Sequence, residues 1–442
     1  MRIARINLCF LAALLLFNAL KVSGQNTEEL RIMQYNILSY RTTNAQCNGN
    51  NNNPTSKDGY IRTIVQYVDP DIILMNELGS QPVNSDRLLT NALNVSGVNK
   101  WEQADYSNNS FSNLVNMLFY DSTRVGLHSQ TYIERDLQNN SLVRVIDLYH
   151  LYYKDPLLYL GGDTTYFTIV GLHLKAGSTS ADEQARDRAT AALVDYLKTQ
   201  VADEAVFICG DFNTRSSNEA SIQNLVTASP LSERIFDPVN SLGMWNNSPL
   251  FANIHSQSTR NSGNTNGGCF SGGGLDDRFD MILVSNAVLN DPASSVRYVN
   301  NSYEVIGNDG SHFNKSIKDA PANTAAPGLV IDALHDNSDH LPVSLEFEVD
   351  KLVLSSGELS PIKLLRMRNP MDGHLSLEFR ANGSDRLDIR VMDLLGKVLV
   401  HRELSMSSDG KFHLNMPFDY PQGLYLLQID GQNWLHTEKV LN

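Results

Sequence analysis

The sequence predicts a layered domain of helices and strands, followed by a small all-β domain. Between Leu30 and about Val349, apolar strand-like runs alternate with segments of helical period, which is typical of α and β layers packed around one core. Beyond Asp350 the pattern changes to short alternating strands with glycine turns and no helical period. A length of 442 residues accommodates both domains.

The first 24 residues have the layout of a secretory signal peptide. Two arginines precede an apolar run from Leu8 to Leu20, and small residues follow it. A membrane anchor is the weaker alternative, because a spanning helix needs about 20 apolar residues and Asn18 interrupts this run. We therefore expect a mature chain that begins at Gln25 and contains no transmembrane segment.

The mature chain is acidic. Removing residues 1–24 takes away three basic residues and no acids, so the formal net charge changes from −14 to 32 − 49 = −17. Tight nucleic-acid binding usually needs a basic face, which this charge does not favour. A local basic cleft or a metal ion can still attract phosphate, so the acidity argues against a nuclease without excluding one.

The elements of the first domain can be placed in order. Leu30 to Leu38 is a predicted strand. Apolar residues then recur at helical spacing from Ile61 to Val68, and Asp69-Pro70 ends this helix before a strand at Ile72 to Met75. Later buried strands are expected at Phe167 to Leu174, Ala205 to Cys209 and Phe279 to Val284.

One long helix and two long loops complete the first domain. Ser180 with Glu183 three residues later forms a capping-box pattern, and residues from Ala185 to Tyr196 share one apolar helical face. The polar tracts 256–274 and 307–328 are expected to be surface loops. Within the second tract, His312 is expected to be a solvated loop histidine.

The second domain is expected to be a small β-sandwich of about 80 residues. Its strands are predicted at Leu375 to Phe379, Leu387 to Met392, Val398 to His401 and Leu424 to Ile429. We therefore divide the chain into a signal peptide (1–24), a first domain (25–350), a Ser/Gly/Pro-containing linker (351–361) and a second domain (362–442).

Three cysteines remain after loss of the signal peptide. Cys209 lies in an apolar run and is expected to be a buried free thiol. Cys47 and Cys269 lie in Asn/Gly-rich loops, where an oxidising compartment would allow them to pair; the sequence leaves this disulfide open. No cysteine has the spacing of a zinc site.

Polar residues stand where the predicted strands of the first domain begin or end. They are Asn36, Glu77, His173, Asp211 with Asn213, Asp280, and Asp339 with His340. Strand ends meet at a common rim of a sheet, where a rigid scaffold can bring such side chains together.

These residue types fit one kind of chemistry. Carboxylate and amide oxygens suit Mg²⁺ or Mn²⁺, which bind phosphate substrates through one or two carboxylates and retain several waters. Two histidines supply an acid and a base near neutral pH. Because no serine or cysteine nucleophile motif is evident, the expected reaction is direct attack of water on the phosphorus of a phosphate ester.

Six segments occur in one order between residues 31 and 345: QYNIL, LMNE, GLHLKAG, GDFN, RFDMILVS and SDHLPV. This series resembles the motifs of the endonuclease/exonuclease/phosphatase superfamily, which includes pancreatic-type deoxyribonucleases, abasic-site endonucleases, bacterial sphingomyelinases and inositol polyphosphate 5-phosphatases. The resemblance implies a four-layered α/β-sandwich of two packed mixed β-sheets with outer helices, and an active site along one edge.

The resemblance also implies a metal site and a catalytic base. Glu77 would be the principal ligand of Mg²⁺ or Mn²⁺, assisted by Asn36 and Asp339. His340 would be the base, and Asp280 would pair with it and orient it.

Further positions would serve the phosphate. Asp211 and Asn213 would hold the phosphate, the attacking water or a second ion. His173 would act as an acid or as a donor to the phosphate, as in the deoxyribonuclease and sphingomyelinase branches. Arg144 is a candidate phosphate contact that no clear motif supports.

Each position taken singly also has a structural interpretation. Asp211 and Asp339 are equally compatible with the shaping of a turn, and a histidine inside an apolar strand, such as His173, is more often a core residue. Six motifs in family order nevertheless favour a site.

The C-terminal segments NPMDGHLSLEF, IRVMDLLGKVLV and PQGLYLLQI resemble the sorting domain of the type IX secretion system of Bacteroidota, over about Leu364 to Asn442. The resemblance implies recognition by that machinery and a secreted or cell-surface protein, exported through the periplasm of a Gram-negative bacterium. A carbohydrate-binding β-module is the alternative.

The leading hypothesis is therefore a secreted, Mg²⁺-dependent phosphodiesterase, a nuclease that hydrolyses extracellular nucleic acid. A sphingomyelinase-like or inositol-phosphate phosphatase is an alternative, because the motifs report the phosphate chemistry and not the leaving group. A non-catalytic surface adhesin on the same fold is a third. We expect a monomer.

Overall fold

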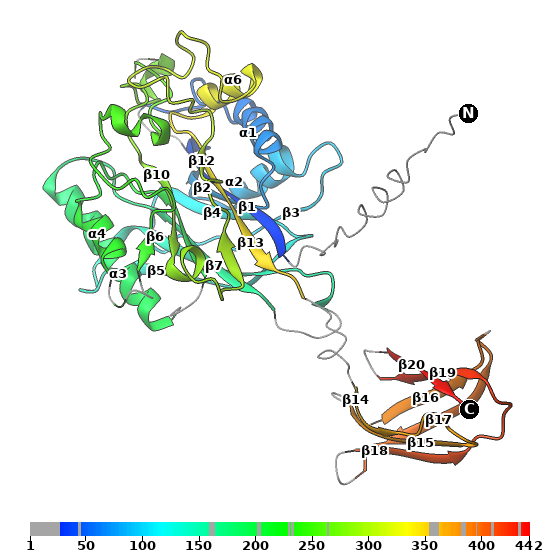
Figure 1. The fold of residues 1–442 in the computed structure, drawn as a ribbon. Coiled ribbons are helices and arrows are strands. Elements are labelled where there is room, and N and C mark those ends of the chain that lie inside the picture. The colour runs from blue at the N-terminus through cyan, green and yellow to red at the C-terminus, as the bar shows by residue number, and fades with distance from the viewer. Residues whose placement is uncertain are drawn as a thin grey trace, which may run out of the picture. The chain divides into compact units, whose positions relative to one another are not determined.

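A computed structural model describes residues 27–42, 46–158, 164–200, 205–228, 230, 234–262, 265–352, 362–381, 386–394, 396–407, 411–431 and 435–442 (Figure 1). The predicted signal peptide and the part of the predicted linker from 353 to 361 lie outside the described residues. Contacts divide the chain into two compact units, one ending at Lys351 and the other comprising Leu352–Asn442 together with Asp155–Thr164.

Two mixed β-sheets form the first unit. The seven-stranded sheet has the order β11-β13-β1-β2-β4-β3, with β12 also paired to β13. Its strands are β1 Thr27–Tyr40, β2 Ile72–Gly79, β3 Trp101–Gln103, β4 Leu114–Asp121, β11 Val296–Tyr298, β12 Glu304–Val305 and β13 Val343–Asp350. The six-stranded sheet has the order β5-β6-β7-β8-β10-β9. Its strands are β5 Val125–Arg135, β6 Ser141–Tyr153, β7 Tyr166–His173, β8 Val206–Asp211, β9 Ile235–Phe236 and β10 Asp280–Ser285.

Helices cover the outer faces of both sheets (Figure 1). The helices and helical turns are α1 Pro54–Val68, α2 Pro82–Leu88, η1 Leu89–Leu93, α3 Ser180–Gln200, α4 Ala220–Val226, η4 Pro249–Ile254, η5 Thr265–Gly268, α5 Asn286–Leu289 and α6 Gly328–Asn337. Apolar residues of α1 and α6 pack with the first sheet, and those of α3 and α4 pack with the second. The arrangement is the expected four-layered α/β-sandwich.

The two sheets meet in an apolar core. Phe167 on β7 and Phe207 on β8 contact Phe347 on β13, with ring centroids 5.2 and 4.7 Å from Phe347. All three rings are fully buried. Aromatic burial of this kind is a large part of the free energy that holds two sheets together. It therefore helps to hold the two sheets at a defined distance from one another.

Local signals explain how α1 and α3 begin and end. Asn53 caps α1 by accepting from the backbone N–H groups of Thr55 and Ser56. The helix ends at Val68, next to the predicted stop, and its C-cap residue Asp69 has a left-handed φ of 49°. The predicted cap of α3 is shifted by one residue. Thr179, rather than Ser180, exchanges hydrogen bonds with the residue three positions on, because its backbone N–H donates to the Asp182 carboxylate and its hydroxyl accepts from the Asp182 N–H.

The polar tract around His312 differs from the prediction. This histidine is fully buried, not solvated. Its Nδ1 lies 2.8 Å from the Asp309 carboxylate, and its Nε2 lies 3.0 Å from the carbonyl oxygens of both Asp319 and Pro321. All three partners are acceptors, so the loop folds around a ring that donates from both nitrogens.

The cysteines behave as the residue context suggested. Cys47 and Cys269 form a disulfide, which resolves the alternative left open by the sequence. Cys209 is a buried free thiol, and burial raises its pKa.

The second unit is a small β-sandwich. A three-stranded antiparallel sheet contains β14 Ile362–Met367, β15 His374–Ala381 and β18 Phe412–Pro417. A four-stranded antiparallel sheet contains β16 Arg386–Met392, β17 Val398–Ser405, β19 Leu424–Asp430 and β20 Leu435–Leu441. Both sheets contribute to one apolar core. Within the parts of the chain that are described, no helix is long and apolar enough to cross a bilayer.

Candidate active site

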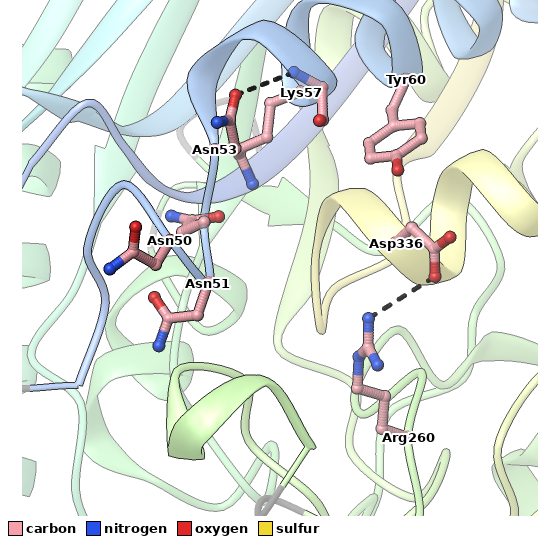
Figure 2. Close-up of a pocket in the computed structure, with 9 residues that line it drawn as sticks. Asn50, Asn51, Asn53, Lys57, Tyr60, Arg260 and Asp336 are labelled. Atoms are coloured by element: carbon pink, nitrogen blue, oxygen red, sulfur yellow. Dashed lines mark hydrogen bonds and ion pairs between the residues drawn. The ribbon is translucent and has the colours of Figure 1, made fainter.

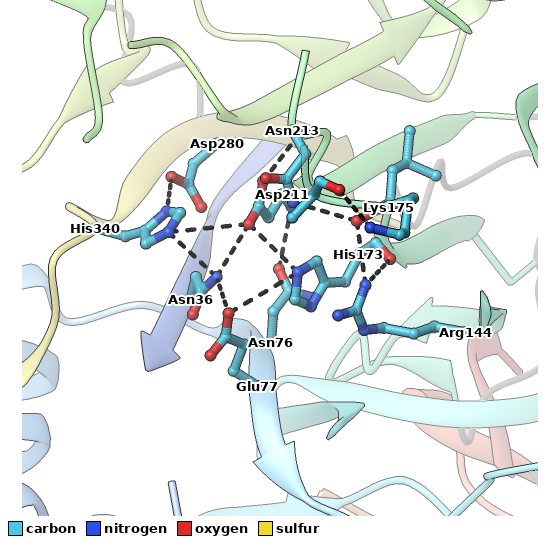
Figure 3. Close-up of polar contacts among 12 residues, drawn as sticks. Asn36, Asn76, Glu77, Arg144, His173, Lys175, Asp211, Asn213, Asp280 and His340 are labelled. Carbon is cyan, nitrogen blue, oxygen red and sulfur yellow. Dashed lines mark hydrogen bonds and ion pairs between the residues drawn. The ribbon is translucent and has the colours of Figure 1, made fainter. Parts of the chain in front are cut away.

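Strand pairing brings the predicted residues to one edge of the sandwich (Figure 3). Parallel pairing of β7 and β8 places His173 opposite Asp211, and antiparallel pairing of β8 and β10 places Asp211 opposite Asp280. Gly210 allows this close approach, because a Cβ there would lie 2.0 Å from the carbonyl oxygen of Leu172. In the other sheet Asn36 pairs with Asn76, next to Glu77.

Asp280 and His340 form a buried pair. Nδ1 of His340 lies 2.7 Å from Oδ2 of Asp280, which also accepts from the Ser256 hydroxyl at 2.8 Å. Burial would lower the pKa of His340, but Asp280, followed by Asp211 and Asp339, raises the pKa well above its usual value. Asp280 thus fixes the orientation of the ring through Nδ1, while Nε2 lies at the cavity, 2.6 Å from the Gln257 amide.

Glu77, His173 and Asp211 offer three ligand atoms that lie within 4.8 Å of one another. Nε2 of His173 is 3.5 Å from Asp211 and 3.9 Å from Glu77. Asn36 links the two carboxylates by donating to Glu77 at 3.1 Å and to Asp211 at 3.0 Å. The predicted metal ligands were Glu77, Asn36 and Asp339. Glu77 is therefore the residue that the predicted ligand set and this geometric cluster have in common.

The backbone at Glu77 is unusual. This residue has a φ of 65°, which is uncommon for a residue with a side chain and is often found where function requires it. Pairing of β2 with β4 shifts register between Met75 and Leu78, and such bulges re-aim side chains. One Glu77 oxygen accepts from the backbone N–H of Ser39 at 2.8 Å, which leaves the other directed at Asn36.

The carboxylates suit a cation. Burial raises the pKa of Asp211 to about 7, with Asp280 and Glu77 adding to the effect of burial and His340 opposing it. Burial also raises the pKa of Asp339. One oxygen of Asp339 accepts from the Ser271 N–H at 2.8 Å. The other is buried without a hydrogen-bond partner among the described residues. A divalent cation would bind that oxygen and reduce the electrostatic repulsion between the neighbouring carboxylates.

A cavity of about 290 Å³ opens onto these groups. Seven of the predicted residues line it, namely Glu77, Arg144, His173, Asp211, Asn213, Asp339 and His340. Asn36 and Asp280 contact this set through the hydrogen bonds described above. The structure therefore brings all nine predicted residues together.

Arg144 and Asn213 shape the side of the cavity next to β7. Nη1 of Arg144 donates to the backbone carbonyls of His173 and Leu174 at 3.3 and 3.2 Å, and its Nε is buried without a partner among the described residues. The Asn213 amide donates to the Leu174 carbonyl at 3.2 Å. Burial, with Arg144 and His340, lowers the pKa of His173 well below its usual value, so this ring is neutral.

Sequence reasoning missed three residues from the tract 256–274, which it treated only as a surface loop. Ser256 bonds Asp280, the Gln257 amide lies 2.6 Å from Nε2 of His340, and Ser271 bonds Asp339. Nothing in a polar, Gly-rich tract distinguishes such residues, because their partners lie elsewhere in the chain.

Sequence reasoning also missed a chain of buried amides between the two sheets, which we call the inter-sheet amide chain. Gln34 donates to Asp280 at 3.1 Å and to Asn76 at 2.9 Å. Asn76 accepts from the Asp211 backbone N–H at 3.2 Å and donates to Asn116 at 2.8 Å. Asn116 donates to the Asp147 carboxylate at 3.0 Å.

The inter-sheet amide chain bridges the two sheets, because its amides lie on β1, β2 and β4 of one sheet and the carboxylates at its two ends lie on β10 and β6 of the other. Burial raises the pKa of its far end, Asp147, to about 7, with Ser107 and Asn116 opposing. Because buried polar groups are costly unless paired, this network fixes the register of one sheet edge against the other. The sequence feature that could have indicated this network is the presence of a polar residue within each of these apolar strands.

A buried His–Asp pair facing clustered carboxylates, with an arginine beside them and no nucleophile motif, defines a metal-dependent hydrolase of phosphate esters. Comparison with protein families agrees. The endonuclease/exonuclease/phosphatase family matches residues 33–310, more than half of the chain, so this protein belongs to that family. Residues 369–441 match the secretion system C-terminal sorting domain.

Solved structures with similar folds span most of the chain. The human Nocturnin catalytic domain is 16% identical, covering 72% of this chain and 94% of its own, with a TM-score of 0.44. TDP2 of D. rerio is 13% identical, covering 72% and 99%, with a TM-score of 0.44. A family protein of Bacteroides thetaiotaomicron is 14% identical, covering 73% and 96%, with a TM-score of 0.45. No curated protein matches the chain.

Proposed function

We propose that this enzyme is a secreted, Mg²⁺-dependent phosphodiesterase that hydrolyses extracellular nucleic acid. The observation that carries the proposal is the Asp280–His340 pair, whose Nε2 lies beside the Gln257 amide and faces a cavity lined by Glu77, Asp211 and Asp339. A base, a set of acidic ligands and a guanidinium surround one space that a phosphate group can enter.

Glu77 and Asp339, with Asn36, would hold the ion, and Asp211 and His173 lie within reach of it. When bound, Mg²⁺ would neutralise charge on the phosphate oxygens. The side chains of the protein perform the other parts of the reaction. The family is metal-dependent, and the identity of the ion as Mg²⁺ is part of the proposal.

In its neutral form His340 can remove a proton from the attacking water, because Asp280 accepts from Nδ1–H and so holds the ring in the tautomer that leaves Nε2 as the acceptor. Arg144 uses one nitrogen, Nη1, for its contacts with backbone carbonyls. Its other N–H groups can therefore donate to the phosphate. His173 is neutral, so it can donate one hydrogen bond to a phosphate oxygen or bind the ion, but it is not a strong acid. Asn213 holds the turn after Asp211 and presents its amide to the same cavity.

The sorting domain directs export by type IX secretion to the cell surface or the extracellular space. We further propose that residues 1–24 take the chain to the periplasm, that the catalytic domain and the sorting domain are 25–350 and 362–442, and that the enzyme acts as a monomer.

A substrate panel tests the proposal. The mature chain from Gln25 is incubated with plasmid DNA, RNA, sphingomyelin, inositol phosphates and a phosphate monoester, each with and without EDTA. We expect nucleic acid to be hydrolysed fastest, EDTA to abolish hydrolysis and Mg²⁺ to restore it. Faster hydrolysis of sphingomyelin or an inositol phosphate would reassign the substrate class.

A further inference from the structure

A second cavity, which we call the asparagine pocket, lies at the start of α1 (Figure 2). It measures about 280 Å³ and is lined by the consecutive asparagines 50–53, by Lys57 and Tyr60 of α1, by Arg260 and by Asp336. It shares no lining residue with the active-site cavity. Figure 2 shows Asn50 and Asn51 on one side of this pocket and Arg260 on the other, where its guanidinium points toward the Asp336 carboxylate.

Several buried groups around the pocket lack partners within the described part of the chain. Lys57 is 1% exposed, and its ammonium, which carries three donors, has one acceptor, the Asn337 carbonyl. Arg260 is 5% exposed and bonds the His335 carbonyl, but its Nε is buried with no partner. Oδ1 of Asn52 is also buried and unpaired. Unpaired buried polar groups are costly, so a ligand that pairs with them is favoured.

The charge of the pocket selects an anion. Lys57 and Arg260 face one acid, Asp336, whose carboxylate is 3.8 Å from Arg260 and 41% exposed. Burial lowers the pKa of Lys57 to about 7, with Asp339 and Glu77 opposing, so an anion beside it also stabilises its charged form. The amino end of α1 adds positive potential.

A wall of residues in contact with one another separates the asparagine pocket from the candidate metal site. Asn52 donates to the carbonyl oxygens of Leu38 and Ser39 at 3.0 and 3.1 Å, Leu38 lines the active-site cavity, and the Ser39 N–H bonds Glu77. The apolar part of the wall is a cluster of Leu38, Phe270 and the Cys47–Cys269 disulfide. Arg260 stacks on Phe270 at 4.0 Å from the ring centroid.

We propose that the asparagine pocket binds a second phosphate group of a nucleic-acid strand whose scissile phosphate lies in the active-site cavity. The inference rests on the proposed function and sharpens it, since an oligonucleotide has repeated phosphates that can fill both cavities. Arg260 and Lys57 pair with the phosphate oxygens, and Asn52 accepts from a sugar hydroxyl or an ordered water. The enzyme should therefore prefer oligonucleotides over a dinucleotide.

The test uses the mature chain and a charge placed at the pocket mouth. Asn50→Asp changes an exposed residue, so folding is preserved, and Arg260→Gln removes the buried cation. The matched control is Asn290→Asp, which makes the same charge change on an exposed residue just after α5, near the other end of β10. KM and kcat are measured on a dinucleotide, which has one phosphodiester, and on a hexanucleotide.

We expect Asn50→Asp and Arg260→Gln to raise KM for the hexanucleotide by on the order of tenfold, the loss of one charge-assisted contact. The dinucleotide constants and the Asn290→Asp control should remain unchanged. Unchanged hexanucleotide KM in Asn50→Asp overturns the proposal even if Arg260→Gln does not fold. A wild-type chain that cleaves neither oligonucleotide refutes the nuclease function, and the binding measurement still decides the pocket.

That measurement is fluorescence anisotropy of a labelled hexanucleotide in EDTA, with inorganic phosphate as competitor. We expect Asn50→Asp to weaken hexanucleotide binding about tenfold, and inorganic phosphate to compete only at far higher concentration. If inorganic phosphate binds wild type but not Arg260→Gln, while hexanucleotide binding is the same in all variants, the pocket is a site for free phosphate and the proposal is wrong.

Discussion

The Asp280–His340 pair offers the sharpest test of the site. Three variants are compared with wild type: His340→Ala, Asp280→Asn and the double variant. Asp280 accepts hydrogen bonds from the His340 ring, the Ser256 hydroxyl and the Gln34 amide. An asparagine keeps the volume but offers one acceptor oxygen and a donor NH₂, so it cannot serve all three donors.

The structure sets the size of each effect. His340 has its Nδ1 anchored by Asp280 and its Nε2 in the cavity, so its loss should cost on the order of 10² to 10⁴-fold in kcat/KM, about 2.7 to 5.4 kcal/mol. Asp280 acts on the reaction through that ring. Its loss should therefore approach the same range, and the double variant should be scarcely worse than His340→Ala, since members of one unit are not additive.

A matched control exists in the second unit. His401 and Asp388 form an exposed pair at 3.0 Å, and His401→Ala with Asp388→Asn should leave kcat/KM unchanged. The assay is kcat/KM on the best substrate of the panel, with folding checked by circular dichroism. Near wild-type turnover of His340→Ala, or losses that multiply in the double variant, would refute the reasoning.

Four further outcomes are expected. Glu77→Gln should lose activity that excess Mg²⁺ or Mn²⁺ partly restores, as titration of metal against rate will show; a loss without rescue argues against a ligand role. Deleting residues 356–442 should preserve kcat/KM but abolish surface display in the native host, and a folded but inactive product contradicts this. Peptide mapping without reduction should recover Cys47 linked to Cys269, and Cys269→Ser should lower the free energy of unfolding by up to about 5 kcal/mol because the bridge spans 222 residues. Burial opposes the charging of His312, but its acceptors outweigh burial and raise its pKa above 6.5. Its stabilisation is therefore full below about pH 6.5 and lost as pH rises through the folded pKa, so His312→Gln should cost more in urea unfolding at about pH 5.5 than at about pH 9.

The sequence by itself determined the fold class and the chemistry. Buried strands such as β8 and β10 are continuous apolar runs, and their period and length identify them without knowledge of their partners. Strand ends carry the functional side chains, so Asp211 and Asp280 could be recognised by their place next to such runs. The stop of α1 at Asp69 is likewise local, since the residues that decide it are neighbours in the chain.

Only the tertiary structure decided which groups meet. Asn36 lies 304 residues from His340 in the chain and 3.4 Å from it in space, and no local pattern encodes such a distance. The same holds for the inter-sheet amide chain, where Asn76 and Asn116 are polar residues inside largely apolar strands. Strand register fixes which side chains face one another across the sheets, and register follows from the packing of both sheets together.

The loops show the limit most clearly. His312 was expected in solvent because its tract is polar, but three acceptors from its own loop surround it. Lys57 and Arg260 come from segments about 200 residues apart and share one pocket because α1 and the tract 256–274 flank the same disulfide. The composition of a loop shows how polar it is. Its burial depends on which other segments of the folded chain pack against it, and only the three-dimensional structure determines that packing.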